Sequence, residues 1–282
     1  MYWIDTHTHI TMLPTIEEQD NCMERTLNAG VKKIVLANVD RDSIEPIAQF
    51  CLRHSQNAFP AIGLHPTEVF ENFEQELVFM ENLINENKTK YVAIGETGID
   101  LYHDKTFKEQ QIIAFREQLR WSKKYNLPVI FHVRNESATP QSTLTPSQTL
   151  TPSQTTTPAS AMDEILDILK HEQNGSIKGV FHCYSGTLQQ AQEIVEMGFY
   201  LGIGGVVTFK NSNLSEIVSQ IDLSKLLIET DAPFLAPVPY RGQQNESSYI
   251  PIIGHKIADV KRVTPQEVAE ITSFNAEQLF KI

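Results

Sequence analysis

The amino-acid sequence predicts an α/β protein, a (β/α)8 TIM barrel of eight parallel strands in a single domain. Eight short runs rich in Val, Ile, Phe and Tyr recur along the chain, and amphipathic stretches with helical spacing lie between several of them. The length of 282 residues is within the range of one such barrel. A doubly wound open sheet is the alternative, but the phosphate-binding pattern G-x-G-x-x-G is missing after the first apolar run.

The predicted elements follow from these patterns in chain order. The strands are 2–7, 32–38, 59–65, 91–97, 128–133, 177–184, 199–205 and 226–231. Helical periodicity is clearest at 73–87, 107–125 and 161–172. Two more helices are expected at 249–262 and 264–280, the second with Thr264 as N-cap and Pro265 as first residue. We expect both to pack outside the barrel wall.

Residues 137–160 form a Thr/Pro/Ser/Gln-rich insertion within the single domain 1–282. The segment contains no charged residue and repeats a T-P-S-Q-T-type unit. Proline blocks helix and central strand, and the few large apolar groups do not offset the entropy of ordering. We therefore expect a mobile extended loop, and deleting 138–159 should leave stability nearly unchanged.

Composition and charge narrow the class of protein. A net charge of -12 argues against coating nucleic acid or anionic lipid by general electrostatics, so any phosphate binding must be local. The three cysteines form no C-x-x-C pair, and no apolar run is long enough for a membrane span. We expect a cytoplasmic protein with no membrane association and no obligate protein partner, acting as a monomer.

Ionisable side chains gather at the ends of the predicted strands. In a closed parallel barrel the carboxyl ends of all strands meet at one mouth, where barrel active sites lie. The topology therefore brings seven potential ligands together: His7, His9, His65, Glu96, His132, His182 and Asp231.

Taken singly, each of these residues has an ordinary explanation. His7 and His9 could belong to a polar edge strand, and Glu96 and Asp231 could cap helices. Burying all of them in apolar strands would cost free energy of folding unless the groups are paired or bound to metal. Imidazole and carboxylate ligands suit divalent Zn, Mg, Mn, Co or Ni. The number of groups fits two ions with a shared carboxylate, for which Glu96 is the natural bridge.

Asp5 lies on the same strand face as His7 and His9 by simple alternation. One step deeper into the barrel, it is expected in the core or holding the free N–H of a histidine.

Six stretches resemble the TatD family of metal-dependent hydrolases, within the amidohydrolase-like barrels. They are IDTHTH (4–9), GLHP (63–66), AIGETGID (93–100), HCYSG (182–186), ETDAPFLAP (229–237) and PYRGQQNES (239–247). The resemblance implies a first metal held by His7, His9, Glu96 and Asp231, and a second held by Glu96, His132 and His182. It also implies hydrolase activity, described as deoxyribonuclease for several members. At 245–247 this chain has NES where the family often has N-E-P. The insertion at 137–160 is also unusual for the family.

Further roles follow from the chemistry of these residues. Asp231 is expected to accept the proton of the attacking water. His65 is expected to contact the substrate phosphate or protonate the leaving oxygen, with the positioning of another ligand as the alternative. Lys210 and Arg241 are candidate phosphate contacts and Tyr240 a candidate base-stacking residue. The competing interpretation of Arg241 is a salt bridge to Glu246.

Three functions are compatible with this constellation. The first is a two-metal phosphodiester hydrolase acting on DNA ends in an exonuclease-like manner. The second is an amide or ester hydrolase, such as a deacylase, with the same metals. The third is a binding protein with a structural metal, which is disfavoured because a structural site is normally closed by its ligands.

Overall fold

The computed structural model describes residues 1–87, 90–136 and 160–282. Eight parallel strands follow one another around a single sheet in the order β1 to β8. A parallel bridge between Thr8 and Ala232 joins the last strand region to the first. The strands are β1 Trp3–Thr8, β2 Val31–Leu36, β3 Ala58–Ile62, β4 Ala93–Asp100, β5 Val129–Arg134, β6 Gly179–Phe181, β7 Tyr200–Ile203 and β8 Leu226–Ile228. The predicted TIM barrel is confirmed.

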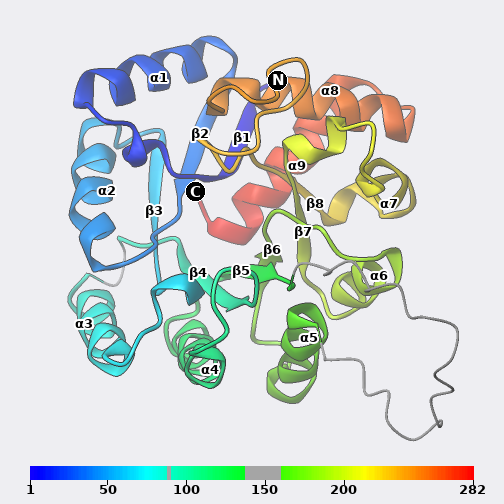
Figure 1. The fold of residues 1–282 in the computed structure, drawn as a ribbon. Helices are drawn as coiled ribbons and strands as arrows, with labels where there is room; N and C mark the ends of the chain where they lie inside the picture. The colour runs from blue at the N-terminus through cyan, green and yellow to red at the C-terminus, as the bar shows by residue number, and fades with distance from the viewer. Residues whose placement is uncertain (88–89, 137–159) are drawn as a thin grey trace, which may run out of the picture.

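Nine α-helices are formed by the described residues, and all but the last surround the strands as a ring (Figure 1). They are α1 Ile16–Asn28, α2 Arg41–Arg53, α3 Phe73–Glu86, α4 Lys108–Tyr125, α5 Ala161–Glu172, α6 Leu188–Glu196, α7 Leu214–Gln220, α8 Ile250–Lys261 and α9 Pro265–Phe280. Short 3₁₀ helices are η1 Ile10–Met12, η2 Pro66–Glu68, η3 Gly205–Thr208, η4 Leu223–Lys225 and η5 Ser247–Tyr249. The five helices predicted from periodicity are all present, within one residue at nearly every end.

Several strands end at other residues than predicted. Strand β4 continues to Asp100, paired with Arg134 of β5, so Glu96 lies inside a strand rather than at its end. Strand β8 ends at Ile228, so Asp231 stands three residues beyond it. His182 directly follows β6. Short strands and the loops after them therefore supply part of the polar cluster.

Helix α9 begins as predicted but ends in an unexpected place. The Thr264 hydroxyl accepts a hydrogen bond from the Glu267 N–H at 3.2 Å, which confirms the N-cap. At its other end, Leu279 and Phe280 are buried in a cluster with one apolar residue from each of seven strands. Figure 1 shows the C-terminus near the middle of the ring. The expectation that α9 packs outside the wall was wrong, because its last turns close one end of the barrel.

The cluster at that end joins strand residues and α9. Its buried members are Ile4, Val35, Ala61, Ala93, Ile130, Val180, Leu227, Ala276, Leu279 and Phe280. The Glu277 carboxylate binds the Tyr2 hydroxyl at 2.6 Å and the Lys33 ammonium at 2.7 Å. Because Tyr2 and Lys33 stand at the starts of β1 and β2, α9 closes the end where the strands begin. The other end is left for the polar residues.

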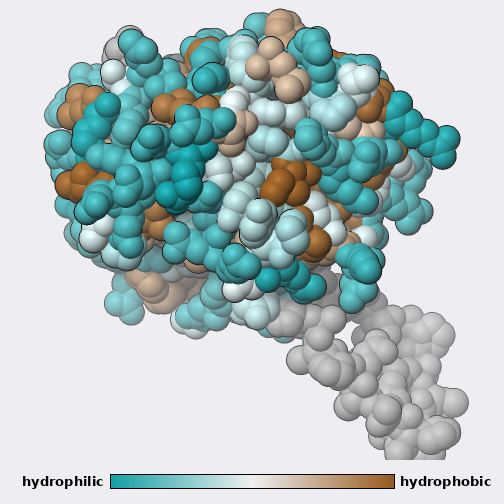
Figure 2. Space-filling model, turned by 90° about the horizontal axis from the view of Figure 1, so that it is seen from above, coloured by the Kyte–Doolittle hydropathy of each residue, from teal (hydrophilic) through white to brown (hydrophobic). Residues whose placement is uncertain are grey.

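The insertion predicted at 137–160 lies outside the described residues from 137 to 159. Its last residue, Ser160, is the N-cap of α5 and accepts a hydrogen bond from the Asp163 N–H at 3.1 Å. Among the described residues, no helix combines the length and the apolar character that crossing a bilayer requires. The face in Figure 2 is largely hydrophilic, with apolar side chains in small separate groups.

Candidate metal centre

Glu96 of β4 stands at the centre of the polar cluster, and its two carboxylate oxygens face different histidines. Oε2 lies 3.2 Å from His7 Nε2 and 3.5 Å from His9 Nε2. Oε1 lies 2.8 Å from His182 Nε2 and 2.9 Å from His132 Nδ1. One carboxylate therefore separates two pairs of imidazoles, which is the arrangement that a bridging ligand requires.

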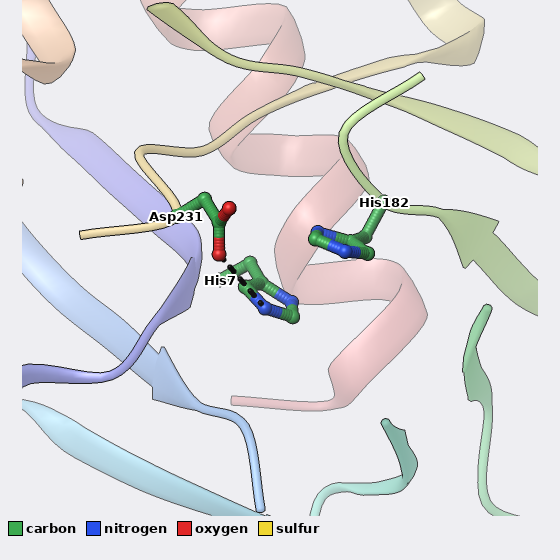
Figure 3. A group of neighbouring side chains, drawn as sticks. All are labelled: His7, His182 and Asp231. Carbon is green, nitrogen blue, oxygen red and sulfur yellow. Dashed lines mark ion pairs between the residues drawn. The ribbon is translucent and has the colours of Figure 1, made fainter. Parts of the chain in front are cut away.

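Asp231 completes the first of these two groups. Its Oδ1 lies 3.6 Å from Nε2 of both His7 and His9. Figure 3 shows His7 between Asp231 and His182, with the ion pair to Asp231 as a dashed line. The rings of His7 and His182 stack at 3.9 Å between centroids. The Asp231 side chain is 16% exposed and that of Glu96 only 3%, so Asp231 faces the open side of the cluster.

The charges in this cluster depend strongly on one another. Burial would raise the pKa of Glu96, but the surrounding imidazoles, His182 and His7 above all, hold it well below its usual range. Burial would lower the pKa of His182, but the charge of Glu96 outweighs it and raises that pKa well above 6.5. The pKa of His7 is lowered by burial and by the charge of His182. The ionised Glu96 therefore holds positive charge at the mouth.

The donors fit divalent cations. Among the described residues, three groups place ligand atoms within 4.8 Å of one another: His7, His182 and Asp231; His7, His9 and Glu96; His65, Glu96 and His132. The buried Nδ1 of His7 has no hydrogen-bond partner in the part of the chain that the structure describes. Only nitrogen and oxygen donors are present, which suits Zn and the harder divalent ions. All six predicted metal ligands belong to these groups.

Two further carboxylates lie beside histidine rings of the cluster, and the one of Asp100 is hydrogen-bonded to its ring. Asp100 Oδ2 lies 3.0 Å from His132 Nε2, and Glu229 Oε1 lies 3.4 Å from His182 Nδ1. Such outer carboxylates fix the tautomer and orientation of ligating imidazoles. The sequence interpretation assigned neither residue a role. The available signal was an acidic residue within or directly after an apolar strand, in GID (98–100) and IET (228–230). An unpaired charge buried there would be costly.

Asp5 does not hold a histidine ring, contrary to one of the two expected roles. Its Oδ1 accepts the backbone N–H of His7 at 3.2 Å and that of Thr230 at 3.0 Å, and its Oδ2 accepts the Thr230 hydroxyl at 2.6 Å. The pairing of β1 with β2 is irregular between Asp5 and Thr8, which interrupts the simple alternation of side chains. Asp5 thus joins β1 to the segment that carries Asp231.

His65, three residues beyond β3 and the N-cap of η2, lies beside the second group. Its Nε2 is 3.2 Å from His132 Nδ1 and 3.6 Å from Glu96 Oε1. Its Nδ1 accepts the backbone N–H of Thr67 at 3.2 Å, so the ring proton belongs on Nε2. Burial, together with the charge of His132, lowers the pKa of His65 to about 4.

The predicted substrate-binding residues lie on the loops after β7 and β8. The Arg241 guanidinium lies 4.5 Å from the ring centroid of Phe209, next to the exposed Lys210. The Tyr240 ring stacks on Tyr249 at 4.4 Å. Glu246 pairs with Arg25 at 2.6 Å, so the Arg241–Glu246 salt bridge considered from the sequence was wrong. The aromatic contacts hold Arg241 and Tyr240 at the surface.

The barrel and this cluster define a class, the metal-dependent hydrolases built on a (β/α)8 barrel. The model of the family "TatD related DNase" matches residues 4–281. The chain belongs to this family and is a metal-dependent hydrolase.

Individual relatives extend the likeness over the whole chain. An uncharacterized metal-dependent hydrolase of Bacillus subtilis, YabD, is 35% identical over 279 residues, covering 99% of this chain and 98% of the relative. The crystal structure of the Escherichia coli TatD homolog YjjV superposes with a TM-score of 0.85 at 27% identity, covering 99% and 98% of the two chains. A TatD family hydrolase from Entamoeba histolytica shares the fold, with a TM-score of 0.81 at 21% identity over 99% of this chain and 98% of the other.

Proposed function

We propose that the protein is a deoxyribonuclease that hydrolyses phosphodiester bonds at DNA ends with two divalent cations. The observation that carries the proposal is Glu96, whose two oxygens face separate pairs of histidines. A shared carboxylate between two ligand sets is typical of hydrolases that use two metals. The family description supports DNA as the substrate.

The ligands divide into two sets around Glu96. His7, His9, Glu96 and Asp231 would hold one cation, and Glu96, His132 and His182 the other. When bound, the pair of cations supplies a nucleophile at neutral pH and neutralises the charge that develops on the phosphoryl oxygens. The protein contributes the spacing of the two sets, and the buried carboxylate of Asp100 orients the ring of His132.

Two side chains would move or hold protons during hydrolysis. The carboxylate of Asp231, on the open side of the cluster, would accept a proton from the attacking water. The pKa of Asp231 is lowered although burial would raise it, because hydrogen bonds from His9 and nearby imidazole charges outweigh burial. Neutral His65 would donate its Nε2–H to a phosphate oxygen, since its Nδ1 already accepts from Thr67.

Substrate contacts at the rim would grip a short strand end. Arg241 presents a planar guanidinium above Phe209, and Lys210 adds a second cation beside it. Such groups bind phosphate oxygens, and Tyr240 with Tyr249 offers a flat surface for a base. A few local cations on a chain of net charge -12 favour a strand end over long duplex contact.

The experiment is a metal-reconstituted screen of substrates. The protein is stripped with a chelator and reloaded with Zn, Mg, Mn, Co or Ni, then given end-labelled DNA, RNA, nucleotides and acylated amines or esters side by side. The proposal expects metal-dependent release of nucleotides from DNA ends. Hydrolysis of acyl substrates without nucleotide release would instead establish the amide or ester hydrolase. Metal binding with no turnover on any substrate would favour the binding protein.

The cellular setting is also part of the proposal. Cys22, Cys51 and Cys183 are all free thiols, which supports a reducing, cytoplasmic compartment. We propose a monomer, because every proposed ligand comes from one chain. Sedimentation of the metal-loaded protein at micromolar concentration tests the oligomeric state.

A further inference from the structure

A second surface that carries a cation, formed by the exposed Arg134 and the ring of Tyr102, lies next to His132. Arg134 is the last residue of β5, two residues after His132, and the side chains of alternate strand residues share a face. The β4–β5 pairing extends to this point, with Asp100 opposite Arg134 and a hydrogen bond of 2.8 Å from the Leu101 N–H to the Arg134 carbonyl. The backbone of Arg134 is therefore held by pairing with β4, as the backbone of His132 is.

An aromatic ring orients the side chain of Arg134. The guanidinium carbon lies 4.1 Å from the ring centroid of Tyr102, which is itself 49% exposed. An arginine stacked on a ring face keeps the N–H groups at the edge of its guanidinium free to donate hydrogen bonds to phosphate. The neighbouring cations are engaged differently, because Lys105 pairs with Glu136 and Lys108 with Glu164.

One buried carboxylate connects this surface to the metal centre. Asp100 Oδ1 accepts the backbone N–H groups of Tyr102 at 2.9 Å and His103 at 3.1 Å. Its Oδ2 lies 3.0 Å from the ring nitrogens His132 Nε2 and His103 Nδ1. The loop that carries Tyr102 and the ring of a metal ligand are thus held by the same side chain.

We propose that Arg134, positioned by Tyr102, binds the backbone phosphate next to the one that is hydrolysed. Two residues along a strand span roughly 6.6 Å, a separation of the same order as that of neighbouring phosphates in an extended single strand. Arg134 would reach one phosphate while the cations held by His132 and its partner ligands would bind the next. The inference rests on the proposed nuclease function and names a contact that this function needs.

The first test compares substrates with one and with several phosphates. Arg134→Ala should lower kcat/KM on a single-stranded oligonucleotide about 10- to 100-fold more than kcat/KM on bis(p-nitrophenyl) phosphate, as expected for a charge-assisted contact. Arg134→Lys should recover part of the loss, and Tyr102→Phe should resemble wild type because the ring face is kept. Equal losses on both substrates would show that Arg134 acts only through His132 and would overturn the proposal.

A matched control is available at the opposite end of the barrel. Lys225 lies 5.8 Å from the ring centroid of Tyr200 at the start of β7. Lys225→Ala removes one positive charge from a similar cation–aromatic pair without touching the mouth. It should leave the ratio of the two kcat/KM values unchanged. A shift like that of Arg134→Ala would mean that overall charge, not a local contact, determines the ratio.

The second test locates the phosphate. Oligonucleotides carrying one neutral methylphosphonate at successive positions are given to wild type and Arg134→Ala. At a single position next to the cleaved bond, the methylphosphonate should slow cleavage by wild type. It should have little further effect on cleavage by Arg134→Ala. If the two proteins respond alike at every position, Arg134 contacts no phosphate.

The third test needs no turnover and so separates this inference from the nuclease proposal. Binding of 5′-fluorescein decathymidylate is followed by anisotropy in chelator at several salt concentrations. Loss of one phosphate contact should reduce the slope of log K against log salt by about 0.7 in Arg134→Ala. An unchanged slope would refute the contact even if DNA is cleaved. A reduced slope with no DNA cleavage by wild type would refute the nuclease and keep the phosphate site.

Discussion

The two ends of the barrel are built from opposite kinds of side chain. At the end where the strands begin, Ala276, Leu279 and Phe280 of α9 meet a layer of apolar strand residues. At the other end, histidines and carboxylates lie within a few ångströms of one another in almost complete burial. Strands of the same barrel supply both ends.

The difference shows how the chain divides stability from function. Burying apolar surface is favourable by about 25 cal/mol per Å². Burying a carboxylate among imidazoles gains little, because desolvation offsets most of the attraction. The apolar end therefore stabilises the barrel, and the polar end is kept for cations. Substitutions at the two ends should separate these roles.

The largest effect on stability is expected at the apolar end. Phe280 is 2% exposed and fills the centre of that end. Phe280→Ala should lower the free energy of unfolding by about 3–5 kcal/mol, because a cavity remains. Urea denaturation of the metal-free protein measures the loss. Phe274→Ala is the control, since Phe274 lies on the same helix and is 60% exposed, and it should cost well under about 1 kcal/mol. A small loss for Phe280→Ala would show that α9 does not seal the barrel.

A substitution at the polar end should affect metal binding more than folding. Asp100→Asn keeps the shape but weakens the support of His132, and should lower metal affinity about 10- to 100-fold. Isothermal titration of the metal-free protein measures the affinity. Asp104→Asn is the matched control, because Asp104 bonds only within its own turn at Thr106. If both variants bind metal equally well, Asp100 does not position the ligand.

Metal affinity at the polar end should rise with pH. Burial lowers the pKa of His9, but hydrogen bonds and charges from Asp231 and Glu96 outweigh it and raise the pKa to about 9. His9 is therefore protonated below pH 9 in the metal-free protein, and a cation must displace that proton. We expect affinity to increase with pH up to at least about pH 9, by as much as tenfold per pH unit for each proton released. A pH-independent affinity between pH 6 and 9 would show that the imidazole is already neutral.

The smallest effect is expected where α9 begins, far from its sealing turns. Thr264→Ala removes the hydroxyl that accepts the Glu267 N–H and should lower the free energy of unfolding by about 1 kcal/mol. Thr264→Ser keeps the hydroxyl and should cost less. Thermal unfolding of the two variants measures the difference. A loss as large as that of Phe280→Ala would mean that the start of α9, rather than its end, holds the barrel together.

The strands and most helices could be predicted because their pattern is local. Runs such as 32–38 and 128–133 are apolar without interruption, as expected for strands covered by helices, and 161–172 repeats apolar residues at helical spacing. The convergence of the histidines followed from the barrel topology alone. The assignment of six of the converging side chains to two metal ions came from the resemblance to the TatD family, and it stays a prediction.

Other features depend on contacts between distant parts of the chain. The amphipathic pattern of 264–280 is the same for a helix on the wall and for one that closes an end, so the place of Phe280 was not predictable. Asp100 acquires its role only when β4 pairs with β5 as far as Arg134. The irregular pairing after Asp5 broke the alternation on which its expected role depended.

The central claim is that Glu96 joins two cation sites at the polar end. The most direct measurement is the metal content and turnover of Glu96→Ala beside wild type, with circular dichroism to monitor the fold. We expect two ions per wild-type chain, and loss of metal and activity together in the variant while the barrel stays folded. Wild-type turnover in Glu96→Ala, or a full complement of two ions, would contradict it.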